Sequence, residues 1–148
     1  MRYFRVLSLL VLMSLAGQSP ANAYDPIQES HLEANIPSER DFEVFLKRDL
    51  EKYFRQSPGQ HVTVKYEFLR NGPTQSGVAY PKYYLWVTVS KKNKTIKSGA
   101  VRVAAIEKKY FDVTDFMPVE EIKRDTEAIY SVFPRPVGDR IKEKMKGM

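Results

Sequence analysis

The stretch YYLWVTVSKKNKTIKSGAVRVAAIEKKYFDVTDF, residues 83–116, decides the fold of this chain. Apolar and polar residues alternate with a period of two in three runs, at about 83–90, 95–106 and 110–116. This period is typical of β-strands with one face packed more fully than the other, because successive side chains of a strand point to opposite faces of its sheet. Short connections separate the runs, so the stretch predicts consecutive antiparallel hairpins.

A further strand and a helix are predicted before this stretch. Residues 62–68, VTVKYEF, alternate in the same way and end at Asn71-Gly72-Pro73. Upstream, apolar residues between positions 42 and 54 recur with the 3.6-residue period of an amphipathic helix. Ser38 is suited to cap that helix, and Ser57-Pro58-Gly59 is suited to end it.

Helices are predicted again after the strands. Pro118 is well placed as the first residue of a helix with an apolar face between 119 and 133 and an irregularity near Asp125. A last short helix follows from the four-residue spacing of apolar positions between 137 and 145. Residues 38–148 therefore read as a single α+β domain: an N-terminal helix packed on a four-stranded antiparallel meander, followed by one or two C-terminal helices.

This order of elements is similar to that of cystatin-like and nuclear-transport-factor-2-like folds, in which a helix packs across a curved antiparallel sheet. Gln75-Ser76-Gly77-Val78-Ala79 does not match the inhibitory Gln-x-Val-x-Gly loop of cystatins, and the chain has no Pro-Trp pair. The resemblance is one of topology, and no functional residue is carried over, because a shared fold does not imply a shared function.

Residues 1–23 have the organisation of a secretory signal peptide. Arg2 and Arg5 form a positive start, residues 6–16 are mostly apolar, and Ala21-Asn22-Ala23 has the small-x-small pattern of a signal-peptidase site. The apolar run is shorter than the roughly 20 residues that span a bilayer. We expect the segment to be cleaved and the protein to be exported, to the periplasm or beyond.

The mature chain is expected to begin at Tyr24 with an extended arm over 24–37, which has prolines near both ends and little periodicity. The chain contains no cysteine, which excludes disulfides, thiol nucleophiles and zinc–thiolate sites. Its formal charge of +6 falls to +4 once Arg2 and Arg5 are removed. Basic and acidic residues are interleaved, so a nucleic-acid partner is not expected.

Motifs for catalysis, metals and cofactors are missing from the sequence. The two histidines, His31 and His61, have no metal-ligand spacing, and neither a glycine-rich phosphate loop nor Gly-x-Ser-x-Gly occurs. We therefore expect no metal and no cofactor, and these absences favour a non-catalytic role over an enzymatic one.

One face of the predicted sheet gathers side chains suited to binding. The candidates for contact with a ligand or partner are Glu67, Tyr84, Trp86, Arg102, Asp112 and Thr114. Aromatic residues and arginine dominate binding surfaces because they combine large area with directional polarity. Hairpin closure is expected to place Arg102 opposite Tyr84 and near Asp112 and Thr114. It is also expected to place Trp86 opposite Ala100, and the first strand to bring Glu67 toward Tyr84. Two alternatives remain: ordinary cross-strand pairs, or a face covered by the C-terminal helices, with Trp86 in the core.

A basic hairpin is a second candidate surface. Lys91, Lys92, Lys94 and Lys97 place four positive charges within seven residues at one end of the sheet. They are suited to contact an anionic surface such as lipid headgroups. Lysines at hairpin tips also protect strand edges against aggregation, which is the alternative interpretation.

Export, small size and missing catalytic motifs favour a non-catalytic binding protein. Its expected partner is a protein of the cell envelope, which it would serve as an inhibitor, immunity protein or accessory factor. The arm supports this class, because extended segments add to sheet edges. The alternative is a small-molecule binder, including an enzyme, with a pocket between the curved sheet and the helices. Contact with the membrane surface is the third hypothesis.

Overall fold

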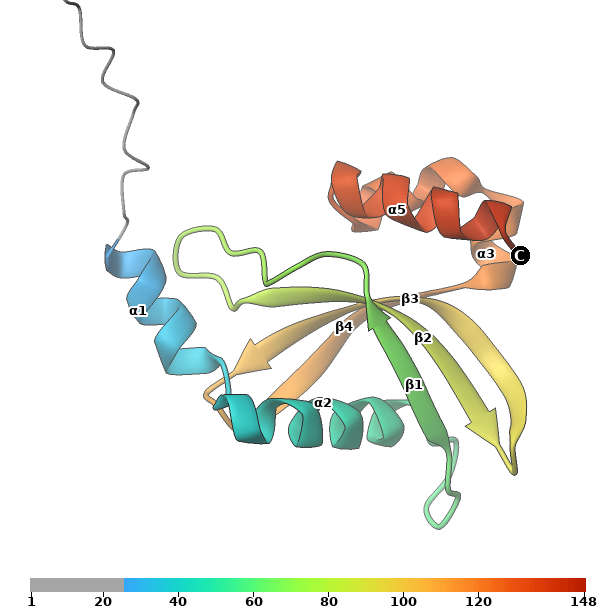
Figure 1. The fold of residues 1–148 in the computed structure, drawn as a ribbon, viewed down its shortest axis with the longest axis horizontal. Helices are drawn as coiled ribbons and strands as arrows, with labels where there is room; N and C mark the ends of the chain where they lie inside the picture. Colours follow the sequence, from blue (N-terminus) through green and yellow to red (C-terminus); the bar gives the residue numbers. More distant parts are fainter. Residues whose placement is uncertain (1–25) are drawn as a thin grey trace, which may run out of the picture.

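The protein folds as an antiparallel sheet with helices on both faces (Figure 1). The structure, a computed structural model, describes residues 26–148, with side chains from residue 29 onward; the expected signal peptide, residues 1–23, lies outside the described residues. In chain order the elements are α1 (Pro26–Asn35), α2 (Glu39–Phe54), β1 (Thr63–Phe68), β2 (Lys82–Lys91), β3 (Lys94–Ile106), β4 (Tyr110–Pro118), α3 (Val119–Arg124), the 3₁₀ turn η1 (Thr126–Ala128), α4 (Ile129–Val132) and α5 (Arg135–Lys146). The predicted α+β class and element order are confirmed.

The strands form the predicted meander, with neighbours in the order β1-β2-β3-β4 and every pair antiparallel. Lys92 and Asn93 connect β2 to β3 with φ angles of 50° and 63°. Two consecutive residues with positive φ are typical of the type I′ turn, whose twist matches that of the flanking strands. The sheet therefore has two edges, β1 and β4.

Helix α2 covers one face of the sheet. Ser38 caps the helix by accepting a hydrogen bond from the Asp41 amide at 3.3 Å, as the sequence predicts. Leu46, Leu50 and Phe54 lie one turn apart and are buried. They pack against alternate residues of all four strands, among them Val64, Tyr83, Leu85, Val87, Val101, Val103 and Phe111. The apolar face of α2 and one face of the sheet thus pack together in one core.

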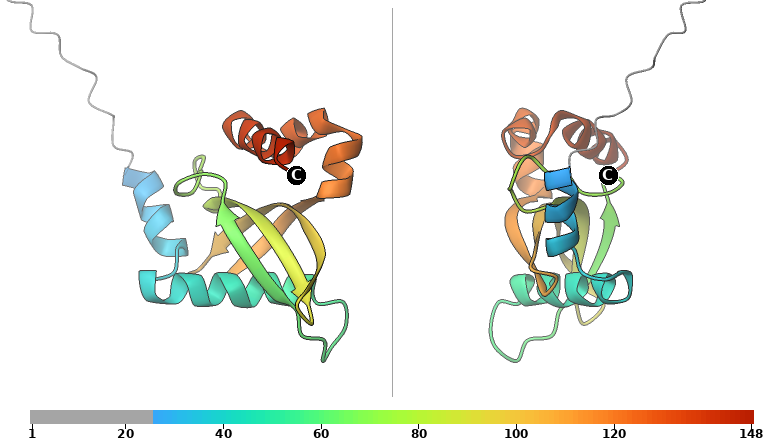
Figure 2. Two further views of the ribbon diagram at one scale, coloured as in Figure 1. Left: turned by 45° about the vertical axis from the view of Figure 1, so that its right-hand side comes forward. Right: turned by 90° about the vertical axis from the view of Figure 1, so that its left-hand side faces the viewer.

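The C-terminal helices cover the opposite face (Figure 2). Tyr84 and Trp86 of β2 are buried beneath them, with Trp86 only 5 % exposed. The second core joins these residues to Leu69, Ala100, Met117, Val119, Ile122, Ile129, Phe133, Val137 and Ile141. An exposed Tyr84–Trp86 face is therefore wrong, and the alternative in which Trp86 belongs to the core is confirmed. The C-terminal helices remove this apolar face of the sheet from water, which stabilises the fold.

The C-terminal segment breaks where the sequence predicts an irregularity. Asp125 ends α3, and its carboxylate accepts hydrogen bonds from the amides of Glu127 and Ala128 at 3.1 and 3.3 Å. This capping lets the chain turn so that Ile122 and Ile129 both face the sheet, and both are fully buried. Among the described residues, no helix has the length and apolar character needed to cross a membrane.

The extended arm expected at 24–37 is wrong for Pro26–Asn35, which form helix α1. The prolines at both ends are compatible with helix boundaries, because proline fits a first turn and Pro37 lies beyond the last one. Asn35 joins α1 to the β3–β4 hairpin: its side chain accepts from the Glu107 amide at 3.0 Å, and its carbonyl accepts from the Lys108 amide at 2.9 Å. These contacts fix a segment whose own periodicity is weak.

Candidate functional site

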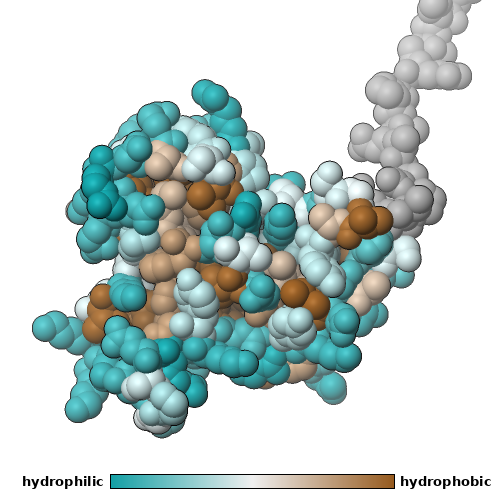
Figure 3. Space-filling model, turned by 180° about the vertical axis from the view of Figure 1, so that it is seen from behind, coloured by the Kyte–Doolittle hydropathy of each residue, from teal (hydrophilic) through white to brown (hydrophobic). Residues whose placement is uncertain are grey.

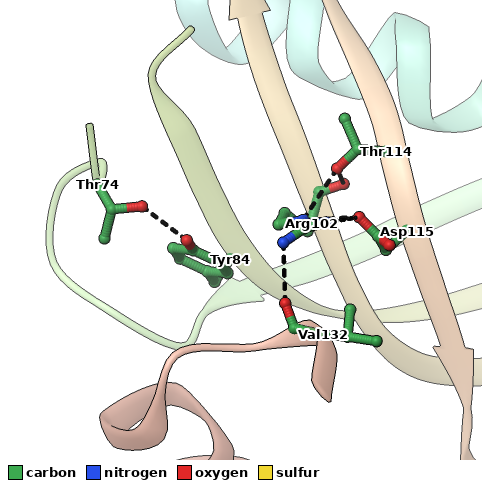
Figure 4. Close-up of polar contacts among 6 residues, drawn as sticks. All are labelled: Thr74, Tyr84, Arg102, Thr114, Asp115 and Val132. Carbon is green, nitrogen blue, oxygen red and sulfur yellow. Dashed lines mark hydrogen bonds and ion pairs between the residues drawn. The ribbon is translucent and has the colours of Figure 1, made fainter. Parts of the chain in front are cut away.

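The polar cluster around Arg102 forms in part as predicted, with a different carboxylate. Arg102 lies opposite Asp115, whereas Val103 lies opposite Val113, so Thr114 is the extra residue of a β-bulge. The Arg102 Nε donates to Asp115 at 2.6 Å and to Thr114 Oγ1 at 3.2 Å (Figure 4). The predicted neighbour Asp112 is paired with Ala104 instead and is exposed. Without the bulge, Thr114 would lie opposite Arg102; the shift of one residue places Asp115 there instead.

The Arg102 guanidinium is occupied by the protein itself. Its Nη1 donates to the carbonyl of Val132 at 2.9 Å, which ties the end of α4 to the sheet. Arg102 and Asp115 are each about a quarter exposed. With donors directed at a carboxylate, a hydroxyl and a carbonyl, Arg102 holds the helices on the sheet and is not presented to an anionic ligand.

Tyr84 and its surroundings bear on the small-molecule alternative. Tyr84 pairs with Arg102 as predicted, and its hydroxyl is hydrogen-bonded to Thr74 Oγ1 at 2.6 Å. The space between sheet and helices is filled by apolar side chains. A hollow of about 350 Å³ lies beside it, and Tyr80 and Tyr130 join Tyr84 and Arg102 in the lining.

Glu67 and Trp86 are brought together by the C-terminal helix. Glu67 pairs across the strands with Trp86, two residues from its predicted neighbour Tyr84. Lys144 of α5 donates to Glu67 at 2.7 Å and lies 5.6 Å from the centre of the Trp86 ring. The interaction anchors the end of α5 over β1 and β2.

The basic hairpin projects from the end of the sheet. Lys91 pairs with Lys94, while Lys92 and Lys97 are exposed near them. This placement suits either contact with an anionic surface or protection of the hairpin tip.

Side chains of α2 occupy two backbone groups at the start of the β4 edge. Asp49 accepts a hydrogen bond from the Phe111 amide at 2.8 Å, and Arg48 donates to the Lys109 carbonyl at 2.9 Å. A hollow of about 680 Å³ lies along this edge, lined in part by Tyr53 and Tyr110. Viewed from behind, apolar residues gather between α2 and the C-terminal helices (Figure 3). Strand addition here is opposed by the two side chains that already occupy backbone groups and by the Thr114 bulge.

The edge at β1 is open. The Leu69 amide donates to the Tyr84 carbonyl at 2.9 Å, so the backbone groups of Leu69 face β2. In an antiparallel pair, alternate residues point their N–H and C=O groups toward the neighbouring strand and away from it. The backbone groups of Val64, Tyr66 and Phe68 therefore point outward, and no hydrogen bond from another residue in the range 26–148 covers them. These groups are therefore available to form backbone hydrogen bonds with an added strand.

A hollow flanks β1 on each face of the sheet. The α2-side hollow, about 660 Å³, is formed by Phe42, Glu43 and Lys47 of α2 with Val64, Tyr66 and Phe68 of β1. The α5-side hollow, about 430 Å³, is formed by Lys65, Glu67, Trp86, Thr88, Lys144 and Met148. An added strand directs alternate side chains to the two faces, so each hollow would receive every second residue. We call the outward backbone groups and the two hollows the edge site.

The edge site combines apolar surface with charges of both signs. Phe68 is 41 % exposed although its ring packs against the rings of Phe42, Tyr66 and Tyr83. Burial, and secondly the negative charge of Glu43, raise the pKa of Tyr66 above its ordinary value. The Tyr66 hydroxyl therefore remains protonated at neutral pH and is a potential hydrogen-bond donor.

Sequence reasoning missed this site. The strand β1 was assigned correctly, and its place at an edge follows from its being the first strand of a meander. The available signal was Phe68, an aromatic residue at the end of a short edge strand that also carries Tyr66. Two of the six predicted binding residues, Glu67 and Trp86, line the edge site.

No group of three or more potential metal-ligating side chains occurs in the described part of the chain. Comparison with protein families, with curated proteins and with solved structures gives no match for this chain. The edge site must therefore be interpreted from its own chemistry.

Proposed function

We propose that the mature protein is an exported, non-catalytic binding protein that holds an extended segment of a partner protein as a fifth strand beside β1. The observation that carries the proposal is the outward ladder of Val64, Tyr66 and Phe68, with a hollow on each side. Export is supported by the signal-like sequence of residues 1–23. Such a protein is suited to act as an inhibitor, an immunity protein or an accessory factor in the cell envelope.

Strand addition divides the work of recognition between backbone and side chains. Each new backbone hydrogen bond contributes about 0.5–1.5 kcal/mol, which the cost of association largely offsets. Affinity and selectivity must therefore come from side chains that enter the hollows. The α2-side hollow has aromatic side chains that favour apolar residues, beside the charges of Glu43 and Lys47. The α5-side hollow has Lys65, Glu67 and Lys144, which favour polar or charged residues. We expect partner segments with alternating apolar and polar residues.

A proline at Tyr66 tests the proposal, because it removes an outward N–H without breaking the β1–β2 ladder. Short random peptides displayed on phage are selected on residues 24–148, and the affinities of the selected peptides are measured by calorimetry. We expect Tyr66→Pro to weaken binding about tenfold or more, because a hydrogen bond is lost and the ring obstructs the added strand.

The matched control is Tyr66→Ala, which removes the same side chain and keeps the N–H. Thermal unfolding of both variants establishes that each is folded. Equal affinity of the two variants for the selected peptides contradicts strand addition at β1, and so does a selection that yields no alternating peptide.

A further inference from the structure

The edge strand β1 is self-complementary in charge. Lys65 and Glu67 stand symmetrically on either side of Tyr66, and their side chains lie on the same face of the sheet. When such a strand meets a second copy in antiparallel orientation with Tyr66 opposite Tyr66, Lys65 of each copy lies opposite Glu67 of the other. Both charge pairs are then attractive.

Backbone geometry allows few registers, and charge selects one of them. Hydrogen bonds between two copies require that the outward residues Val64, Tyr66 and Phe68 pair only with one another. A shift in one direction places Lys65 opposite Lys65, and a shift in the other places Glu67 opposite Glu67. Like charges opposite each other destabilise strand pairing, so the Tyr66–Tyr66 register is favoured.

We propose that, when no partner segment is bound, two copies of the chain join through β1 in this register and form one continuous sheet. The inference rests on the proposed function for the location of the site and adds what occupies the site at rest. The arrangement has two-fold symmetry, so the same patch serves both copies. A partner strand must displace the second copy to bind.

Burial of exposed surface supports the same pairing. The favoured register places Val64 opposite Phe68 of the second copy, on the α2 side, where Phe68 is 41 % exposed. On the α5 side, Met148 is 61 % exposed beside Lys65. Glu67 is about half exposed although it binds Lys144, so its carboxylate is accessible to a second lysine. Pairing thus covers apolar surface on both faces and adds a charge pair on each side of the symmetry axis.

Sedimentation velocity over a concentration range up to millimolar tests the inference on residues 24–148. We expect a monomer–dimer equilibrium that Lys65→Glu weakens about tenfold or more, because both charge pairs become repulsive. The triple variant Lys65→Glu/Glu67→Lys/Lys144→Glu reverses every charge of the pairing, including the ion pair within each copy, and is expected to recover the dimer to within about threefold. Lys94→Glu, on an exposed part of β3, is the control for net charge.

The outcomes separate this inference from the proposed function. A wild-type chain that stays monomeric, or a dimer that Lys65→Glu leaves unchanged, overturns the dimer. In either case, if the wild-type chain binds the selected peptides and Tyr66→Pro weakens that binding, the proposed function stands without the dimer. A charge-sensitive dimer that binds no peptide after dissociation supports the dimer and contradicts the partner-binding function.

Discussion

Replacing Trp86 with alanine is expected to lower the free energy of unfolding by about 3–5 kcal/mol, as truncation of a buried tryptophan typically does. The ring is 5 % exposed and packs in the core between the sheet and the C-terminal helices. Urea unfolding followed by far-UV circular dichroism measures the change, since the variant lacks the only tryptophan. Iodide is expected to quench the fluorescence of the wild-type protein only weakly.

The control is Val78→Ala, which removes apolar atoms from a side chain that is 73 % exposed and should change stability by less than about 0.5 kcal/mol. If Trp86→Ala costs no more than Val78→Ala, or if iodide quenches strongly, the C-terminal helices do not cover this face. The edge site would then lose its α5-side wall.

Replacing Arg102 with alanine is the second large effect we expect, a loss of about 2–3 kcal/mol. The substitution removes the donors that satisfy Asp115 and the Val132 carbonyl, leaving a partly buried carboxylate without its cation. Thermal and urea unfolding measure the loss. Asp115→Ala should also be destabilising, because it leaves the guanidinium partly buried without its carboxylate.

Asp112→Ala distinguishes this account from the sequence-based expectation. Asp112 is exposed and does not contact Arg102, so its loss should change stability by less than about 0.5 kcal/mol. An effect of Asp112→Ala as large as that of Asp115→Ala would contradict the bulge at Thr114.

The sequence was sufficient to predict the fold because its periodicities are local and consistent. The alternation in 83–116 and the apolar stripe between 42 and 54 predict the elements, and that stripe packs on one face of the sheet. The pairs Tyr84–Arg102 and Trp86–Ala100 follow from the length of the β2–β3 turn, and both are confirmed. Hairpin geometry does not predict the full register of β3 with β4, because that register shifts at the Thr114 bulge.

Three features depend on tertiary structure and leave no such signal. The bulge at Thr114 inserts one residue in a strand that still alternates on both sides, so Asp115 cannot be distinguished from Asp112 by pattern. The face covered by α3–α5 depends on how the chain turns at Asp125. Helix α1 is held by Asn35 and its distant partners on the β3–β4 hairpin, not by its own apolar periodicity.

The two edges of the sheet explain why a binding role is assigned to one of them. Hollows lie beside both edges, but Asp49 and Arg48 of α2 occupy backbone groups at the start of β4, whereas no residue in the range 26–148 occupies the outward groups of β1. Natural sheets usually protect open edges, because unpaired backbone groups attract other strands. An edge left open between two hollows is therefore the part of this molecule best suited to bind an extended chain.

The central claim is that β1 offers Val64, Tyr66 and Phe68 to an added strand, and amide hydrogen exchange measured by NMR tests it most directly. In the wild-type protein, at a concentration where sedimentation shows only monomer, these three amides should exchange fast, while those of Lys65, Glu67 and Leu69 are protected by β2. A selected peptide should then protect all three outward amides. If they are already protected in the isolated monomer, or stay unprotected when peptide is bound, β1 is not the binding edge.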